Sequence, residues 1–203
     1  LTLFNMKKAS IHNNEKKVDE LYKESKTLIS SMSSTIDDFT NFFNPQKEKK
    51  SFEIKDAINE ALIILRKVIE VENIHIQIDV PINYKVIGVS NELSQVIINL
   101  IQNSKDAFIQ NDIKNKTIII TLKEELILDK KYALLEIKDN AGGISKENID
   151  KIFDPYFTTK YKSQGTGLGL FMSKMIIEKS LEGELSHKNC DDGSIFIIKL
   201  ILG

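Results

Sequence analysis

Amide and carboxylate side chains recur at helical spacing between Asn91 and Gln110. At about 100° per residue, the apolar residues of this segment gather on one side of a helix. The polar residues gather within a narrow arc on another side: Glu92, Gln95, Asn99, Asn103 and Asp106. One interpretation is a solvated outer face. Such faces favour Lys, Glu and Gln, however, and Asn lowers helix propensity, so a ligand or metal site is the other interpretation.

Two glycine-containing segments follow, and both could bring a ligand close to the backbone. Asp139 ends a strand-like run and is followed by small residues (140–143), which either let it hold a planar donor group or form a tight turn. Gly165, Gly167 and Gly169 precede an apolar-periodic helix, where free backbone N–H groups and the helix dipole favour an anion. Their spacing is neither that of a P-loop nor that of a dinucleotide fingerprint.

The charge composition narrows the classes of ligand. The 203 residues include 28 Lys+Arg and 29 Asp+Glu, a net charge of −1, so no global field recruits nucleic acid or an anionic membrane. Arg66 is the single arginine, so any phosphate must be held by lysines, backbone amides or a metal. Cys190 lies in a turn-like stretch (189–193) and is interpreted as a bystander thiol, and a single cysteine suits a reducing compartment.

A boundary near Pro45 divides the chain. Residues 15–43 contain no Gly or Pro, and apolar or small residues recur there at alternating steps of four and three, the spacing of a helical bundle seam. A surface helix would show the same stripe, but a length of about eight turns favours a long antiparallel or dimeric bundle. Pro45 and the lysine-rich residues after it end the pattern.

Helices and strands alternate irregularly beyond this boundary. Helices are expected at 56–70, 91–110 and 169–180, and strands at 74–80, 84–89, 117–122, 132–139, 184–187 and 194–200. Because there is no regular βαβ rhythm, the pattern predicts an α+β fold, a two-layer α/β sandwich with a mixed sheet.

Four motifs in a fixed order carry a resemblance to a known family. They are Asn99-x-x-x-Asn103-x-x-Asp106, Asp139-x-x-Gly142-Gly143, the segment 153–160 and the glycine-rich segment 165–170. Together they resemble the catalytic ATP-binding domain of sensor histidine kinases, in the superfamily that includes gyrase, heat-shock chaperone and mismatch-repair ATPases. The resemblance covers about residues 52–203 and implies the Bergerat-type ATP-binding fold. Ala141 departs from the family, which usually has Gly there.

The resemblance implies roles for individual residues, with ATP and magnesium as cofactors. Asn99 and Asn103 would coordinate magnesium and the phosphates, Asp139 would receive the adenine amino group, and residues 153–165 would form a mobile lid. The expected nucleotide-binding residues are Asn99, Asn103, Asp106, Asp139, Gly143, Thr159, Lys160, Gly165, Thr166, Gly167, Leu168 and Gly169.

The residue type at Asn99 separates the classes of this superfamily. Relatives that hydrolyse ATP commonly carry Glu at this place, where a carboxylate can activate water. Asparagine cannot take that proton, although its carbonyl can ligate magnesium. The γ-phosphoryl group would then wait for a protein nucleophile, with Lys160 contacting it, which favours a protein histidine kinase. The alternatives are an ATPase clamp or chaperone and a nucleotide-binding module without catalysis.

The resemblance also implies that residues 1–50 are part of a dimerisation hairpin and that 51–203 are the catalytic domain. His12 lacks an acidic neighbour, while His75 and His187 fall in strands, so we expect the phosphoacceptor histidine to lie upstream of Leu1. Expected partners are a response regulator receiver domain and a second copy bound through the hairpin, with no nucleic acid. The expected location is cytoplasmic, with membrane attachment only through segments that this sequence does not contain.

Overall fold

The computed structural model describes residues 17–23, 25–26, 29, 48–160 and 166–202. The chain forms two compact units. The first contains Leu1–Pro45 and Asp154–Leu168, and the second contains Gln46–Phe153 and Gly169–Gly203. In the first unit, the described residues between 17 and 29 are helical. The rest of the helix expected at 15–43, together with His12, falls outside the described residues.

The second unit holds the sheet and its covering helices. Its elements are β1 Lys50–Glu53, α3 Ile54–Val71, β2 His75–Asp79, β3 Lys85–Gly88, α4 Ser90–Gln110, β4 Thr117–Ile127, β5 Lys130–Asp139, the 3-10 helix η1 Ile149–Lys151, α5 Gly169–Met175, the π-helical turn η2 Ile176–Ser180, β6 Glu184–Asn189 and β7 Ser194–Ile201.

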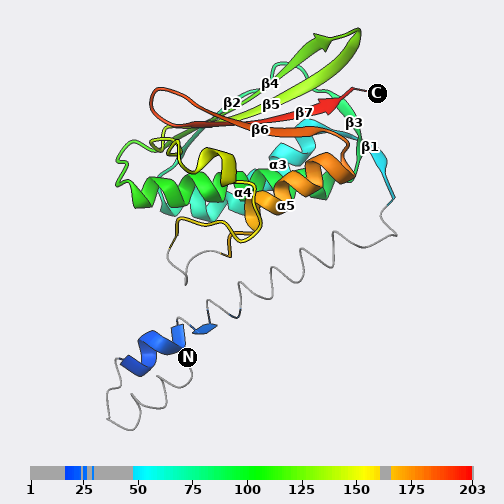
Figure 1. Ribbon diagram of the computed structural model, residues 1–203. Helices are drawn as coiled ribbons and strands as arrows, with labels where there is room; N and C mark the ends of the chain where they lie inside the picture. The colour runs from blue at the N-terminus through cyan, green and yellow to red at the C-terminus, as the bar shows by residue number, and fades with distance from the viewer. Residues whose placement is uncertain (1–16, 24, 27–28, 30–47, 161–165, 203) are drawn as a thin grey trace. The chain divides into compact units, whose positions relative to one another are not determined.

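The main sheet has the strand order β2-β4-β5-β7-β6. Strand β2 runs parallel to β4, and the other neighbours are antiparallel, so the sheet is mixed. Helices α3, α4 and α5 lie on one face of this sheet, as Figure 1 shows. Strands β1 and β3 form a separate antiparallel pair. The prediction of an α+β two-layer sandwich with a mixed sheet is confirmed.

Alternating burial explains why the strands and helices pack in this way. On β4, Ile118, Ile120 and Leu122 face the helices and are at most 2% exposed, while the residues between them are half-buried. The helix α4 buries Leu93, Ile97 and Leu100 completely. Each such side chain contributes about 1.5–3 kcal/mol when it leaves water. This burial holds α4 against the sheet. It thereby also fixes the directions in which the polar side chains of α4 extend.

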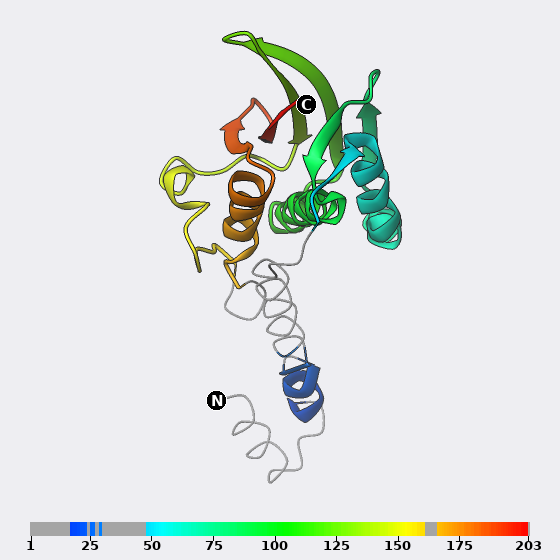
Figure 2. The same ribbon diagram turned by 90° about the vertical axis from the view of Figure 1, so that its right-hand side faces the viewer.

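The structure differs from the expected elements at three places. Strand β1 was not expected, because its first two residues, Lys50 and Ser51, are polar and exposed. Strands β4 and β5 extend beyond the expected bounds into a long hairpin, which projects from the sheet in Figures 1 and 2. Glu92 was expected on a polar face but is buried at 6% exposure, where its carboxylate accepts a hydrogen bond from Ser180.

Candidate functional site

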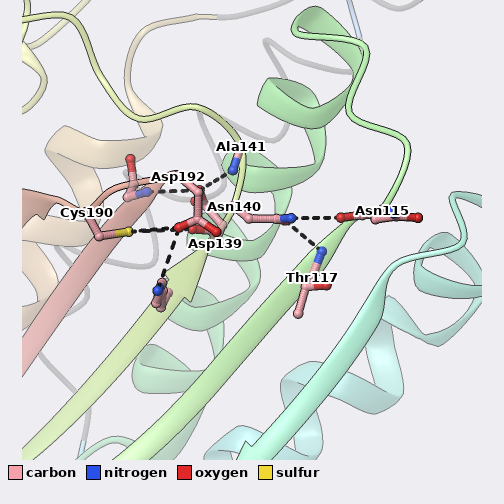
Figure 3. A network of polar contacts seen from close by, with 9 residues as sticks. Asn115, Thr117, Asp139, Asn140, Ala141, Cys190 and Asp192 are labelled. Carbon is pink, nitrogen blue, oxygen red and sulfur yellow. Dashed lines mark hydrogen bonds and ion pairs between the residues drawn. The ribbon is translucent and has the colours of Figure 1, made fainter.

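Asp139 is a buried carboxylate at the end of β5, with 4% of its surface exposed. Its Oδ1 accepts a hydrogen bond from the backbone N–H of Ala141 at 2.9 Å (Figure 3). It accepts a second from the backbone N–H of Ser194 at 3.1 Å. Its Oδ2 accepts one from the hydroxyl of Ser104, on α4, at 2.7 Å. A carboxylate oxygen has two lone pairs, so these bonds fill Oδ1 and leave one acceptor position on Oδ2.

The backbone at Gly193 packs closely against the backbone of Asp139. A Cβ added to Gly193 would lie 1.9 Å from the backbone oxygen of Asp139, so only glycine fits there. After Asp139 the chain turns through Gly142 and Gly143, whose φ angles of 93° and 75° favour glycine. The tight turn and the positioned carboxylate, two alternatives from the sequence, are therefore both present.

Asparagine side chains fix the same turn from outside. The Asn140 amide accepts from the Thr117 N–H at 2.9 Å and donates to the Asn115 carbonyl at 2.8 Å, as Figure 3 shows. Asn111 donates to the Ala141 carbonyl at 2.6 Å. Because these bonds join the turn to the end of α4 and the start of β4, the position of Asp139 depends on these elements as well as on β5.

Asn99, on the same helix as Ser104, contacts α5. Its Nδ2 donates to the hydroxyl of Ser173 at 2.8 Å. A Cβ added to Gly169 would lie 2.6 Å from Asn99 Oδ1, so the amide rests against the glycine backbone. Asn99 and Ser104 are five residues apart, about 7.5 Å along the helix axis. The middle of α4 thus carries both the Asn99 amide and the partner of a buried carboxylate.

The other polar residues of α4 lie in the same unit. Asn103 and Asp106 are half-buried rather than solvated. The Asp106 carboxylate forms an ion pair with Lys105 at 2.5 Å. Asn99, Asn103 and Asp106 are therefore only partly exposed, whereas Gln95, from the same expected polar face, is exposed.

The predicted site residues divide between the two units. Asn99, Asn103, Asp106, Asp139, Gly143 and Gly169 belong to the second unit, whereas Thr159, Lys160, Thr166, Gly167 and Leu168 belong to the first. Gly165 falls outside the described residues.

Gly167 has a local structural role within the first unit. Its φ is 69°, and an added Cβ would lie 2.4 Å from the backbone carbon of Tyr156. The backbone N–H of Lys160 donates to the hydroxyl of Thr158 at 3.1 Å. The glycine at 167 is therefore required for the chain to return close to residue 156, whatever else the segment binds.

Ser104, Ser173 and Gly193 were not expected from the sequence. Both serines occupy core positions of apolar helices and are at most 2% exposed. A buried hydroxyl requires a hydrogen-bond partner. A serine on the apolar face of a helix therefore indicates a buried hydrogen bond, although the sequence does not show which residue is its partner.

His187, on β6, lies near the same carboxylate. Its Nε2 is 3.3 Å from the Ser194 hydroxyl oxygen, and its ring centroid is 5.0 Å from that of Phe196. Burial lowers the pKa of His187 from its ordinary value of 6.5, and the negative charge of Asp139 opposes this by a smaller amount.

We expect the free energy of unfolding to decrease as the pH falls through about 6.5, because the unfolded chain binds a proton at His187 before the folded chain does. Urea unfolding across this pH range should show a shallower pH dependence for His187→Gln. The matched control is His75→Gln, at an exposed position of β2, which should keep the wild-type dependence. An unchanged slope in the His187 variant would contradict the assignment.

Known proteins resemble this chain in both sequence and structure. Residues 88–203 match the family described as histidine kinase-, DNA gyrase B-, and HSP90-like ATPase. The chain belongs to this family of ATP-binding domains.

Sensor proteins and histidine kinases are among its relatives. The two-component sensor PprA of Pseudomonas aeruginosa is 31% identical over 157 residues, which cover 76% of this chain and 17% of PprA. The catalytic domain of histidine kinase ThkA, in a nucleotide-free form, has 29% identity and a TM-score of 0.65, over 77% of this chain and 97% of that domain. ThkA in complex with the response regulator TrrA has the same fold, with 23% identity and a TM-score of 0.67, over 94% of this chain and 52% of that one.

Proposed function

We propose that the chain is the catalytic region of an ATP-dependent protein histidine kinase of two-component signal transduction. It would transfer the γ-phosphoryl group of ATP to a histidine on a dimerisation helix, for relay to an aspartate of a response regulator. The observation that carries the proposal is the arrangement on α4, where Asn99 and Ser104 lie about 7.5 Å apart along the helix. Ser104 donates to Asp139 at 2.7 Å. By the family resemblance, Asn99 would occupy the place where relatives that hydrolyse ATP carry a Glu as general base.

The proposed adenine contact uses the open acceptor position of Asp139 Oδ2. The exocyclic amino group of adenine is a hydrogen-bond donor, and the buried carboxylate has three of its four acceptor positions filled by protein groups. A fourth donor would complete its hydrogen bonding. Gly143, on the turn that follows, is also proposed to contact the nucleotide; a Cβ there would lie 3.0 Å from Asn189 Oδ1.

Magnesium suits the oxygens that the Asn side chains offer. The Nδ2 of Asn99 donates to Ser173, so Oδ1 is the part of the amide left to meet a cation. Magnesium prefers oxygen ligands and keeps several waters, so two amide carbonyls, from Asn99 and Asn103, fit its needs together with phosphate oxygens. Asn99 and Asn103 would hold the ion, which would supply positive charge to offset the negative charge of the phosphates.

The remaining phosphate contacts are proposed for the glycine-rich segment and the residues before it. Arg66, the single arginine, is exposed on α3 and is not among the proposed phosphate contacts. Lys160 would contact the γ-phosphate, and Asp106 would assist the phosphate end from α4. The other proposed contacts are Thr159, Gly165, Thr166, Gly167, Leu168 and Gly169.

The proposed organisation follows that of sensor kinases. Residues 1–50 would belong to a helical dimerisation hairpin and 51–203 to the catalytic domain, in a cytoplasmic protein. The ThkA structure, solved with the response regulator TrrA, supports a response regulator as partner. Among the residues that the structure describes, no helix is long and apolar enough to span a membrane.

The proposal is tested by measuring whether the domain hydrolyses bound ATP when no phosphoacceptor protein is present. An amide at residue 99 cannot accept a proton from water. The domain with ATP and magnesium should therefore bind nucleotide and release almost no free phosphate over many minutes. Steady phosphate release above that of an Asp139→Asn control would contradict the kinase proposal and favour an ATPase clamp.

A further inference from the structure

We infer that Ser173 is a positioning residue that sets the orientation of the Asn99 amide, and through it the metal dependence of nucleotide binding. The inference rests on the proposed function, because it concerns how this chain presents a magnesium ligand. Ser173 lies on α5 and matches none of the four motifs found in the sequence.

The first observation is the hydrogen bond between α4 and α5. Ser173 is 1% exposed, and its Oγ lies 2.8 Å from Asn99 Nδ2, which donates to it. An amide carries donors on nitrogen and acceptors on oxygen, so a bond that engages the nitrogen decides where the oxygen points. Oδ1 of Asn99 is then the group available as a ligand.

The second observation is the contact with Gly169, four residues before Ser173 and on the same side of α5. An added Cβ there would lie 2.6 Å from Asn99 Oδ1 and 2.9 Å from Nδ2. The glycine backbone therefore limits the position of the amide plane, while the Ser173 hydroxyl, which accepts from Nδ2, holds the nitrogen end of the amide towards Ser173. Both constraints come from one helix.

Removal of the Ser173 hydroxyl would weaken this selection. The terminal torsion of Asn is broad and roughly two-fold, so a half-turn exchanges Oδ1 and Nδ2 at small cost once no bond distinguishes them. An NH2 group offers a metal ion no lone pair and points hydrogens at it. We therefore expect metal affinity to fall, while contacts at Asp139 stay intact because they depend on Ser104.

A near-isosteric pair of variants separates the hydroxyl from its volume. Ser173→Thr and Ser173→Val place the same number of heavy atoms in the buried site, but only Thr keeps an acceptor for Asn99 Nδ2. Binding of Mn²⁺, as a spectroscopic substitute for magnesium, is measured by electron paramagnetic resonance in the presence of a non-hydrolysable ATP analogue. Binding of the analogue without metal is measured in parallel by calorimetry.

Ser173→Val should weaken Mn²⁺ binding by about tenfold or more relative to Ser173→Thr, the range found when partners of metal ligands are lost. Metal-free analogue binding should be equal in the two variants. Equal Mn²⁺ affinity in the pair would overturn the inference, as would an equal loss of metal-free binding. If either variant fails to fold, Ser173→Ala against wild type serves the same comparison.

The wild-type protein keeps the two proposals apart. If wild type binds the analogue and Mn²⁺ but the variants match it, Ser173 has no positioning role and the proposed function stands. If wild type binds no analogue, with or without metal, the proposed function fails and the inference fails with it.

Discussion

Asp139→Asn is expected to abolish the rise in melting temperature that excess ATP gives the unmodified domain. In the variant, the remaining oxygen can still accept from Ala141 and Ser194, but an NH2 group replaces Oδ2. That group can donate to Ser104, so the fold should survive. It is a donor like the adenine amino group, however, so the two groups cannot form a hydrogen bond. For the unmodified domain, ATP at one hundred times its Kd adds about 2.7 kcal/mol to the free energy of unfolding.

Two comparisons make this result specific to adenine recognition. Asp192→Asn is the matched control, because Asp192 is an exposed neighbour whose carboxylate lies 3.7 Å from Lys138. It should keep the full ATP-induced shift. Inosine triphosphate offers an acceptor where adenine offers a donor, so it should stabilise the Asp139→Asn variant more than ATP does. An undiminished ATP shift in that variant would show that the adenine site is elsewhere.

Gly193→Ala should destabilise the domain more than any other single methyl addition near the site. The new Cβ would lie 1.9 Å from the backbone oxygen of Asp139 and 2.6 Å from its carbonyl carbon. Both neighbours are backbone atoms of a central strand, so the strand end must move. Overpacking of this kind costs about 1–3 kcal/mol, occasionally more. The shift should also displace the Asp139 carboxylate and weaken ATP binding.

Urea unfolding of Gly193→Ala measures this cost. Asp191→Ala, at an exposed position of the same turn, is the control. It should change the free energy of unfolding by less than about 0.5 kcal/mol. If Gly193→Ala unfolds at the wild-type midpoint, the close approach of Gly193, in the turn before β7, to Asp139 is not present in solution.

The sequence predicted elements whose burial follows a regular period. Helix α4 and strands β4, β5 and β7 were expected because their apolar residues repeat at 3.6 or 2 residues. Asp139 could be located because it ends such a strand. Strand β1 has too few apolar residues for a pattern, and it pairs with β3 through main-chain hydrogen bonds that no periodicity reveals.

The contacts that orient the site were not predictable in the same way. Ser104 meets Asp139 across 35 residues of sequence, and Asn99 meets Ser173 across 74. Such pairs depend on how α4, α5 and the sheet pack together. Glu92 shows the same limit, because helical spacing assigned it to a polar face, whereas packing against η2 buries it beside Ser180.

Transfer of phosphate to histidine tests the central claim most directly. The domain is incubated with magnesium, ATP labelled in the γ-phosphoryl group and a separate histidine-bearing dimerisation hairpin. We predict acid-labile label on the hairpin histidine, lost when that histidine is replaced and lost with Asp139→Asn. Nucleotide binding without label on the hairpin, whether or not free phosphate appears, would contradict the assignment as a histidine kinase.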